Sequence, residues 1–478
     1  MNQLIFIILC IIILINFSCC EIIFVFELSR HGARAPKLIN AQDQGEFIDK
    51  YGVEWKTNMG ITPIGMRMQY LLGVRNRYKY SSLLSSIYDP KELLIFSSQL
   101  NRHIMSAQSQ LQGMFPPQTG ATLSKEELPH ARPPNLLTQE VENEIAQLGD
   151  DALPEKVQII PIHNYNSAEL TLLKSEISTC PPLEKIKKEL RKQSLFTDYY
   201  NKVNNTYGKQ LQKYFKMPNR DFLYDYDNMF YLADTFISDY VNNRDLSHFQ
   251  QESGINDLND YYKLCVEMKR LYLYYGESNE FIGVMAASLT MKKIISWMEM
   301  RIQRVMKGDK EMKVARYEEP KFVMYSGGDT TMGPIQLFMK EAFGVDVVYP
   351  SFCSNVFFEL HKKEEKGDYE GYYVEYYMDD ELKVNISFPQ FKNEVEKIMW
   401  SEEKIREYCF PVIKGKLIML IIGGMVIILI ALAFVLCRFY CNQCKGFQET
   451  TENGDDKGEE LQDKKAGRKG SSRFRTGC

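Results

Sequence analysis

The sequence has no marked excess of charge of either sign. Its 478 residues include 62 acidic and 58 basic side chains, which gives a formal net charge of −4. A nucleic-acid-binding protein needs a basic face, so this balance predicts no nucleic-acid partner. Hydrophobic residues make up 45% and charged residues 25%, a globular composition that excludes disorder of the whole chain.

The body of the chain also lacks internal repeats, low-complexity stretches and cysteine pairs with the close spacing of zinc ligands. Of 11 cysteines, those in the body are Cys180, Cys265, Cys353 and Cys409. An even number in an oxidising compartment predicts two disulfides and leaves three pairings open.

Long apolar runs are confined to the two ends. The first, 4–17, is short and is followed by small residues at Ser18 and Cys20. This pattern predicts a signal peptide over 1–20, with a signal anchor as the alternative because no Lys or Arg precedes the run.

The second run, 417–437, carries no charge and lies between Lys416 and Arg438. Its length suits a transmembrane helix, which needs about 20 apolar residues. We therefore expect a single-pass type I membrane protein with a lumenal or extracellular body and a disordered cytoplasmic tail over 438–478. The lysosome or vacuole, the secretory pathway and the cell surface all fit this plan.

Two kinds of modification are expected from this topology. Sequons at Asn204 and Asn385 indicate a glycoprotein. The cysteines at the membrane edge are either palmitoylated or plain reduced thiols, and they are Cys437, Cys441 and Cys444.

Three short apolar segments of the body predict β-strands, at 21–28, 93–96 and 321–325. Helical spacing follows the second and the third. Strands that alternate with helices predict an α/β fold with a mixed, mainly parallel sheet flanked by helices.

The middle of the body, 121–289, is mostly helix-like, with its clearest helices at 183–195 and 281–306. We expect it to form a helical cap domain inserted into the α/β core, which then comprises 21–120 and 290–410.

Charged side chains follow all three predicted strands. Arg30, His31 and Arg34 follow the first, Arg102 follows the second, and Asp329 follows the third. Ligands of α/β sheets bind beyond the carboxyl ends of the strands, so we expect these five side chains to converge on one pocket.

This set of residues suits phosphate monoester hydrolysis. Arginine forks bind phosphate oxygens, and like charge would keep His31 neutral, with a lone pair free to attack phosphorus. Asp329 is then placed to donate a proton to the leaving alcohol and later to activate water. The alternative interpretation of His31 and the two arginines beside it is a salt-bridged turn at the surface. His31 has no second ligand nearby in the sequence, so we expect no metal and no cofactor.

The stretch 30–36, Arg-His-Gly-Ala-Arg-Ala-Pro, resembles the signature of the histidine acid phosphatases, the acid-phosphatase and phytase branch of the histidine phosphatase superfamily. The stretches 61–65 and 98–102, and 351–353 further on, also resemble family segments. The order of leader, body, span and tail is similar to that of lysosomal and membrane-bound acid phosphatases.

The resemblance implies a role for each site residue. His31 would be the nucleophile, Asp329 the proton donor, and Arg30, Arg34 and Arg102 the phosphate-binding arginines. A phosphate monoester is then the substrate, and a homodimer is compatible with the resemblance. It also implies the disulfides Cys180–Cys409 and Cys265–Cys353.

One position departs from the family pattern, because Gly328 stands where the family has a histidine beside the aspartate. Losing one donor to a phosphoryl oxygen costs about 10²–10³ in turnover. A weakened acid phosphatase is favoured because the nucleophile, the phosphate-binding arginines and the proton donor remain. The alternative is a catalytically inactive membrane receptor or binding protein that retains an anion pocket. On the first interpretation, Gly328→His should raise turnover about tenfold.

Overall fold

The computed structural model describes residues 21–37, 47–132, 138–164, 180–217, 221–307, 320–363, 369–411 and 415–448. The expected signal peptide and most of the expected cytoplasmic tail lie outside these residues. The chain forms two compact units, one up to Phe410 and one from Pro411.

The first unit is built on a seven-stranded sheet with the strand order β5-β4-β6-β1-β7-β8-β9. The strands are β1 (Glu21–Arg30), β4 (Leu93–Ser97), β5 (His163–Asn164), β6 (Phe322–Gly327), β7 (Asn355–Lys362), β8 (Tyr372–Met378) and β9 (Glu381–Ser387). Pairing is parallel from β5 to β1 and antiparallel from β1 to β9. The predicted mixed sheet is confirmed, and the three predicted strands are β1, β4 and β6. The expectation that it is mainly parallel is wrong, because three of its six pairings are antiparallel, those that join β1, β7, β8 and β9.

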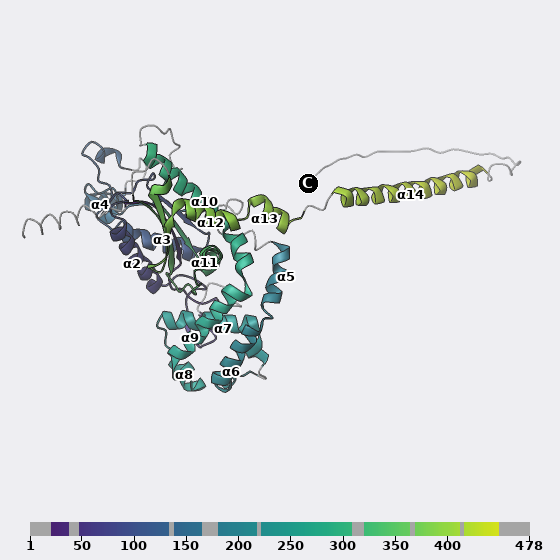
Figure 1. Ribbon diagram of the computed structural model, residues 1–478, viewed down its shortest axis with the longest axis horizontal. Coiled ribbons are helices and arrows are strands. Elements are labelled where there is room, and N and C mark those ends of the chain that lie inside the picture. The colour runs from purple at the N-terminus through teal and green to yellow at the C-terminus, as the bar shows by residue number, and fades with distance from the viewer. Residues whose placement is uncertain are drawn as a thin grey trace, which may run out of the picture. The chain divides into compact units, whose positions relative to one another are not determined.

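Helices cover both faces of this sheet (Figure 1). One face carries α10 (Glu280–Lys307), α11 (Asp329–Phe343) and α12 (Phe388–Ile398), and the other carries α2 (Pro63–Lys79) and α3 (Asn101–Met114). Phe24, Phe26 and Leu28 of β1 pack with the first set, whereas Val25 packs with the second. Because both faces are covered, β1 and β6 are buried over nearly their whole length, which explains their continuous apolar sequences.

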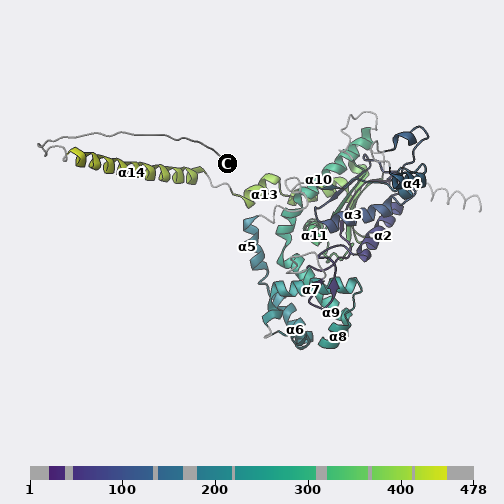
Figure 2. The ribbon, with the colours of Figure 1, turned by 180° about the vertical axis from the view of Figure 1, so that it is seen from behind.

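A second group of helices has a hydrophobic cluster of its own, rich in Tyr and Phe. Its members are α6 (Ser194–Tyr214), α7 (Tyr226–Val241), α8 (Ser247–Ser253) and α9 (Leu258–Leu271). Figure 2 shows them gathered at one end of the unit. The helix predicted at 183–195 is interrupted, because Gln193 is extended between α5 (Pro181–Leu190) and α6.

The remaining elements are short. They are β2 (Phe47–Ile48), β3 (Glu54–Trp55), α4 (Gln139–Leu148), α13 (Glu402–Cys409), the 3₁₀ turns at Leu128–His130, Pro154–Lys156, Asp221–Tyr224 and Tyr369–Gly371, and a π turn at Tyr272–Gly276.

One of the two disulfides implied by the resemblance is present. Cys180 and Cys409 are bonded, which joins the start of α5 to the end of α13. The other pairing is wrong, because Cys265 and Cys353 are free thiols. Cys265, on α9, is buried in the aromatic cluster of α6 to α9, whereas Cys353 lies shortly before β7, where its backbone N–H donates to the carbonyl of His31.

The second unit is a single described helix, α14 (Gly415–Gln448). Its stretch Ile422–Phe439 has a mean hydropathy of 2.6 and no buried residues, so its length and composition allow it to cross a membrane. Helix α10 also meets this test of length and composition, but 67% of its apolar window is buried, as in the core helix of a globular unit.

Candidate active site

The ends of β1, β4 and β6 bring together the loops that carry the predicted site residues. Strands β1 and β6 remain paired as far as Arg30 and Gly327, and the N–H of His31 then donates to the carbonyl of Gly327 at 3.0 Å. Asp329 is the first residue of α11, separated from β6 by Gly328 alone, and Arg102 lies in the first turn of α3, after β4. The predicted convergence at one sheet edge is what the structure displays.

Two glycines fix the position of the His31 loop. A Cβ on Gly32 would lie 2.3 Å from the carbonyl oxygen of Gly65, and a Cβ on Gly65 would lie 2.1 Å from that of Ala33. Thr62 caps α2 by accepting from the N–H of Gly65 at 3.1 Å, and its own N–H donates to Ala33 O. The stretches 30–36 and 61–65 therefore form the two sides of one close backbone contact.

His31 is buried and presents a free ring nitrogen. Its Nδ1 lies 2.8 Å from the carbonyl oxygen of Gly32, which can only accept, so Nδ1 carries the proton. Burial, followed by the charge of Arg30 and the neighbouring His103, holds the pKa of His31 well below its usual 6.5. The neutral ring therefore has its lone pair on Nε2, the form that a nucleophile needs.

Arg30 is held on several sides at once. Its Nη1 donates to Tyr349 OH at 3.1 Å and to Pro350 O at 2.6 Å, and its Nη2 donates to Asp329 Oδ2 at 3.0 Å. The guanidinium also lies 4.6 Å from the ring centroid of Phe352. These contacts fix its plane beside His31.

Arg34 makes a buried ion pair with a residue that the sequence did not indicate. Its Nη2 donates to both carboxylate oxygens of Asp234, on α7, at 2.9 and 3.1 Å. Lys269, on α9, donates to the same carboxylate at 3.0 Å and lies 3.8 Å from Asp329 Oδ2. The charges alternate from Arg34 through Asp234, Lys269 and Asp329 to Arg30, and this series ties α7 and α9 to the strand ends.

Arg102 differs from the other two arginines, because it has no ion pair among the residues that the structure describes. Its Nε is buried without a hydrogen-bond partner. Burial and the nearby charge of Arg34 lower the pKa of Arg102 to about 10, which still leaves it fully charged in acid. An anion in the pocket would supply the missing counter-charge.

Asp329 is ionised among the charges that surround it. Burial alone would raise its pKa, but Arg30, Lys269 and Arg34 outweigh burial and lower the pKa of Asp329 to about 2. Its Oδ1 accepts from the N–H of Thr330 at 2.9 Å. The carboxyl can therefore act as an acid only after a proton reaches it in the substrate complex.

Gly328 is the N-cap of α11, with φ −123° and ψ 178°, an extended conformation open to any residue. A Cβ there would lie 3.6 Å from both Cε1 and Nε2 of His103. His103 follows Arg102 in α3, and its ring stacks on that of His31 with centroids 5.1 Å apart. The sequence analysis assigned no role to His103, although its position beside a predicted phosphate-binding arginine was a usable signal.

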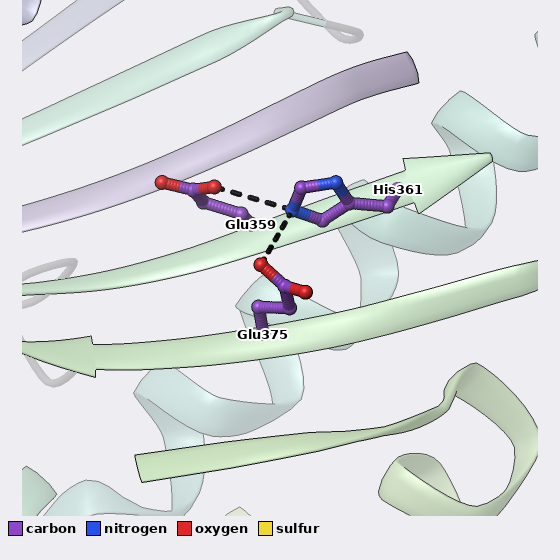
Figure 3. A group of neighbouring side chains, drawn as sticks. All are labelled: Glu359, His361 and Glu375. Carbon is purple, nitrogen blue, oxygen red and sulfur yellow. Dashed lines mark hydrogen bonds and ion pairs between the residues drawn. The ribbon is translucent and has the colours of Figure 1, made fainter. Parts of the chain in front are cut away.

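A second group of polar side chains lies away from this pocket, on β7 and β8, and has the donor types of a metal site. Figure 3 shows Nε2 of His361 directed at carboxylates of Glu359 and Glu375, each at 3.2 Å. Tyr80 and Lys79 both donate to Glu359 at 2.6 Å. Further donors reach Glu375 from Tyr377 at 2.6 Å and Asn385 at 2.7 Å. The group is thus a closed hydrogen-bond network with its carboxylates already satisfied.

Comparison with known proteins gives one consistent family. The sequence profile of the histidine phosphatase superfamily (branch 2) matches residues 21–379. Lysosomal acid phosphatase of Xenopus laevis is 25% identical over 91% of this chain and 90% of its own. Prostatic acid phosphatase of Mus musculus is 25% identical over 76% of this chain and 80% of its own. The crystal structure of Klebsiella sp ASR1 phytase shares the fold, with a TM-score of 0.53 and 13% identity over 80% of this chain and 96% of its own.

Proposed function

Because the chain belongs to the histidine phosphatase superfamily (branch 2), we propose that it is an acid phosphatase that hydrolyses phosphate monoesters through a phosphohistidine at His31. The family relationship supports phosphatase activity in general. The residue roles that follow rest on the geometry of the pocket.

In the first step, Nε2 of His31 attacks phosphorus and the bond from phosphorus to the ester oxygen breaks. Asp329 gives its proton to the departing oxygen, so an alcohol leaves and a phosphohistidine remains. In the second step, water attacks the phosphohistidine and Asp329 takes the proton from water. Inorganic phosphate is released, and His31 regains its lone pair.

Arg102 supplies the main free charge for the phosphoryl group, since Arg30 and Arg34 already contact carboxylates. Phosphate binding adds negative charge near Asp329 and opposes the field that keeps this carboxyl ionised. A substrate that arrives as the monoanion also brings the proton that Asp329 then passes to the leaving oxygen. Both effects favour catalysis in acid.

The observation that carries this proposal is the hydrogen bond from Nδ1 of His31 to the carbonyl oxygen of Gly32. It leaves the lone pair on Nε2 of this buried residue, near Arg102, whose Nε has no hydrogen-bond partner among the described residues. The test is hydrolysis of p-nitrophenyl phosphate in mild acid by the full chain in detergent. His31→Ala should abolish turnover, and a base-quenched wild-type reaction should contain phosphohistidine. His130→Ala, at an exposed histidine, is the matched control and should have wild-type activity. Equal rates for wild type and His31→Ala would overturn the assignment.

Gly328 favours a second candidate function, that of a membrane-bound receptor or binding protein that keeps the anion pocket without turnover. The same assay separates the two. Saturable binding of inorganic phosphate with no hydrolysis by the wild type would support the second candidate.

The membrane arrangement is part of the proposal. We place the body in the lumen of a lysosome, a vacuole or the secretory pathway, or at the cell surface, with α14 as the anchor. The hydropathy of Ile422–Phe439 and the names of the lysosomal relatives support this arrangement. Protease treatment of sealed vesicles should spare the body and remove only the tail.

A further inference from the structure

His103 is the one imidazole near His31 that the mechanism above does not use. Its side chain is 4% exposed, and its Nε2 is buried without a hydrogen-bond partner among the residues that the structure describes. An unpaired buried ring nitrogen costs free energy unless something in the functioning site bonds to it.

The other ring nitrogen of His103 shows which nitrogen carries the proton. Nδ1 lies 2.5 Å from Ser98 Oγ, and this oxygen also accepts from the N–H of Leu100 at 3.4 Å. If Nδ1 were the donor, Ser98 Oγ would receive two donors, and its own proton would have no acceptor among the side chains and carbonyls that the structure describes. The consistent arrangement has Ser98 donating to Nδ1, so the neutral ring of His103 carries its proton on Nε2.

The position of this N–H suits a phosphoryl oxygen. The ring of His103 stacks on that of His31, which carries the nucleophilic lone pair. Its Nε2 also lies 3.6 Å from the place where a Cβ on residue 328 would be, and Gly328 leaves that space open. Burial, with the charge of Arg102, lowers the pKa of His103 to about 3, so the ring adds a donor without adding a charge beside the arginines.

We propose that His103 is a catalytic residue whose Nε2–H donates a hydrogen bond to an oxygen of the phosphoryl group as that group passes to His31. This inference rests on the proposed phosphatase function. Ser98 acts as a positioning residue, because it fixes the tautomer and orientation of the ring. The donor that Gly328 cannot supply thus comes from the first turn of α3 instead of the start of α11.

The proposal changes the expectation for Gly328→His. In the variant that keeps His103, the Cβ of a histidine at 328 would lie in contact with the ring of His103, 3.6 Å from its Nε2. The two imidazoles would then compete for the same phosphoryl oxygen, so we expect no gain in turnover. In a His103→Ala background no imidazole occupies the space beside residue 328. There Gly328→His should raise kcat at least about tenfold above that of His103→Ala alone.

Kinetics of the full chain in detergent test the assignment. His103→Ala should lower kcat about 10²-fold with a smaller change in KM, because the donor acts mainly on developing charge. His103→Gln places an amide N–H near the former Nε2 and should retain most of the activity. Ser98→Ala changes a partly exposed side chain, and it should lower kcat several-fold without loss of the folded state.

A binding measurement keeps this test separate from the phosphatase assay. Orthovanadate accepts the five-coordinate geometry of a phosphoryl group in transfer, whereas inorganic phosphate does not. His103→Ala should weaken vanadate binding about tenfold or more and leave phosphate binding within a few-fold.

The outcomes are distinguishable. If the wild type has no turnover, the proposed function fails, and the vanadate comparison alone decides the role of His103. If His31→Ala is inactive while His103→Ala keeps wild-type kcat and vanadate affinity, the role proposed for His103 is overturned. A folded His103→Gln variant with activity no better than that of His103→Ala would also overturn it.

Discussion

At the scale of single residues, the low pKa of Asp329 predicts an unusual dependence of rate on pH. Since its pKa is about 2, the free enzyme is ionised at this carboxyl throughout mild acid. In the proposed mechanism the productive complex needs one proton shared by Asp329 and the substrate, so kcat/KM should be level in acid and fall as the substrate loses its proton. For a phosphate monoester that loss occurs near pH 6, about its second pKa.

The measurement is kcat/KM against pH for alkyl phosphates whose second pKa is lowered in steps by fluorine substitution. The alkaline limb should move to lower pH with the substrate. If the limb stays at one pH for every substrate, an enzyme group with a higher pKa controls it, and the pKa given for Asp329 is wrong in the working enzyme.

Only some residues of the candidate site could be predicted from the sequence. The positions of Arg30, His31 and Asp329 were predictable because these residues lie at or just beyond the ends of buried strands. Asp234 and Lys269 were not, since they lie on helices far along the chain and nothing local marks a salt bridge as buried.

At the scale of elements, the contact between Gly32 and Gly65 predicts a local defect. In Gly65→Ala, the new Cβ would lie 2.1 Å from Ala33 O and 2.6 Å from Ala33 N, so the loop that carries His31 must shift. A displacement of about 1 Å at a nucleophile costs about 10²-fold in rate. We expect kcat/KM to fall by about that factor.

The matched control is Ile64→Ala, at a residue of the same helical turn with 41% of its side chain exposed. It should leave kcat/KM unchanged, and both variants should show a cooperative thermal transition. Wild-type kcat/KM for Gly65→Ala would show that the loop accommodates the methyl group and that the close contact has no catalytic consequence.

Strand β8 shows why one element was not predicted from the sequence. In β8 the burial alternates along the strand, but tyrosine occupies buried and half-buried positions alike, as in Tyr372 and Tyr373. The period of two that marks a strand is therefore hidden in the residue types. In β1, by contrast, a continuous run of apolar residues made the strand visible.

At the scale of the whole molecule, buried titrating groups predict greatest stability in mild acid. Burial raises the pKa of Glu27 from 4.5 to about 7 and that of Asp239 from 3.8 to about 9. The protonated carboxyls favour the fold, so this stability is complete below the lower value of each pair and is lost as the pH rises through the higher one. Burial lowers the pKa of His103 to about 3 and that of His31 well below 6.5. Their contribution is complete above pH 6.5 and is lost as the pH falls.

Between about pH 4.5 and 6.5, the pKa values of Glu and His in the unfolded chain, the loss from the two carboxyls and the gain from the two histidines cancel. The free energy of unfolding should therefore have a plateau over this range of pH. Above it, the free energy of unfolding should decrease by up to about 1.4 kcal/mol per pH unit for each group that still titrates. Below it, Asp329 adds a loss as the pH falls from 3.8 toward 2.

Asp239→Asn tests this at one position, where the carboxyl lies beside Asp49 and accepts from Trp55 Nε1 at 3.0 Å. The variant should lose less stability than the wild type between pH 7 and 9, measured by denaturant unfolding of the full chain in detergent. Asp227→Asn, at an exposed site of the same helix, is the control and should follow the wild-type profile. Parallel profiles for Asp239→Asn and the wild type would contradict the assigned pKa.

The Cys180–Cys409 bond has a mechanical consequence under the proposed arrangement, in which α14 anchors the chain in a membrane. Tension applied to the chain after residue 409 is transferred at that sulfur to Cys180, at the start of α5. Helices α12 and α13 and the antiparallel strands before them then carry little of the load, because they lie within the covalent loop that the bond closes. An anchored body can thus bear tension while these antiparallel strands stay paired in the sheet, and reduction of the disulfide would expose the strands to that force.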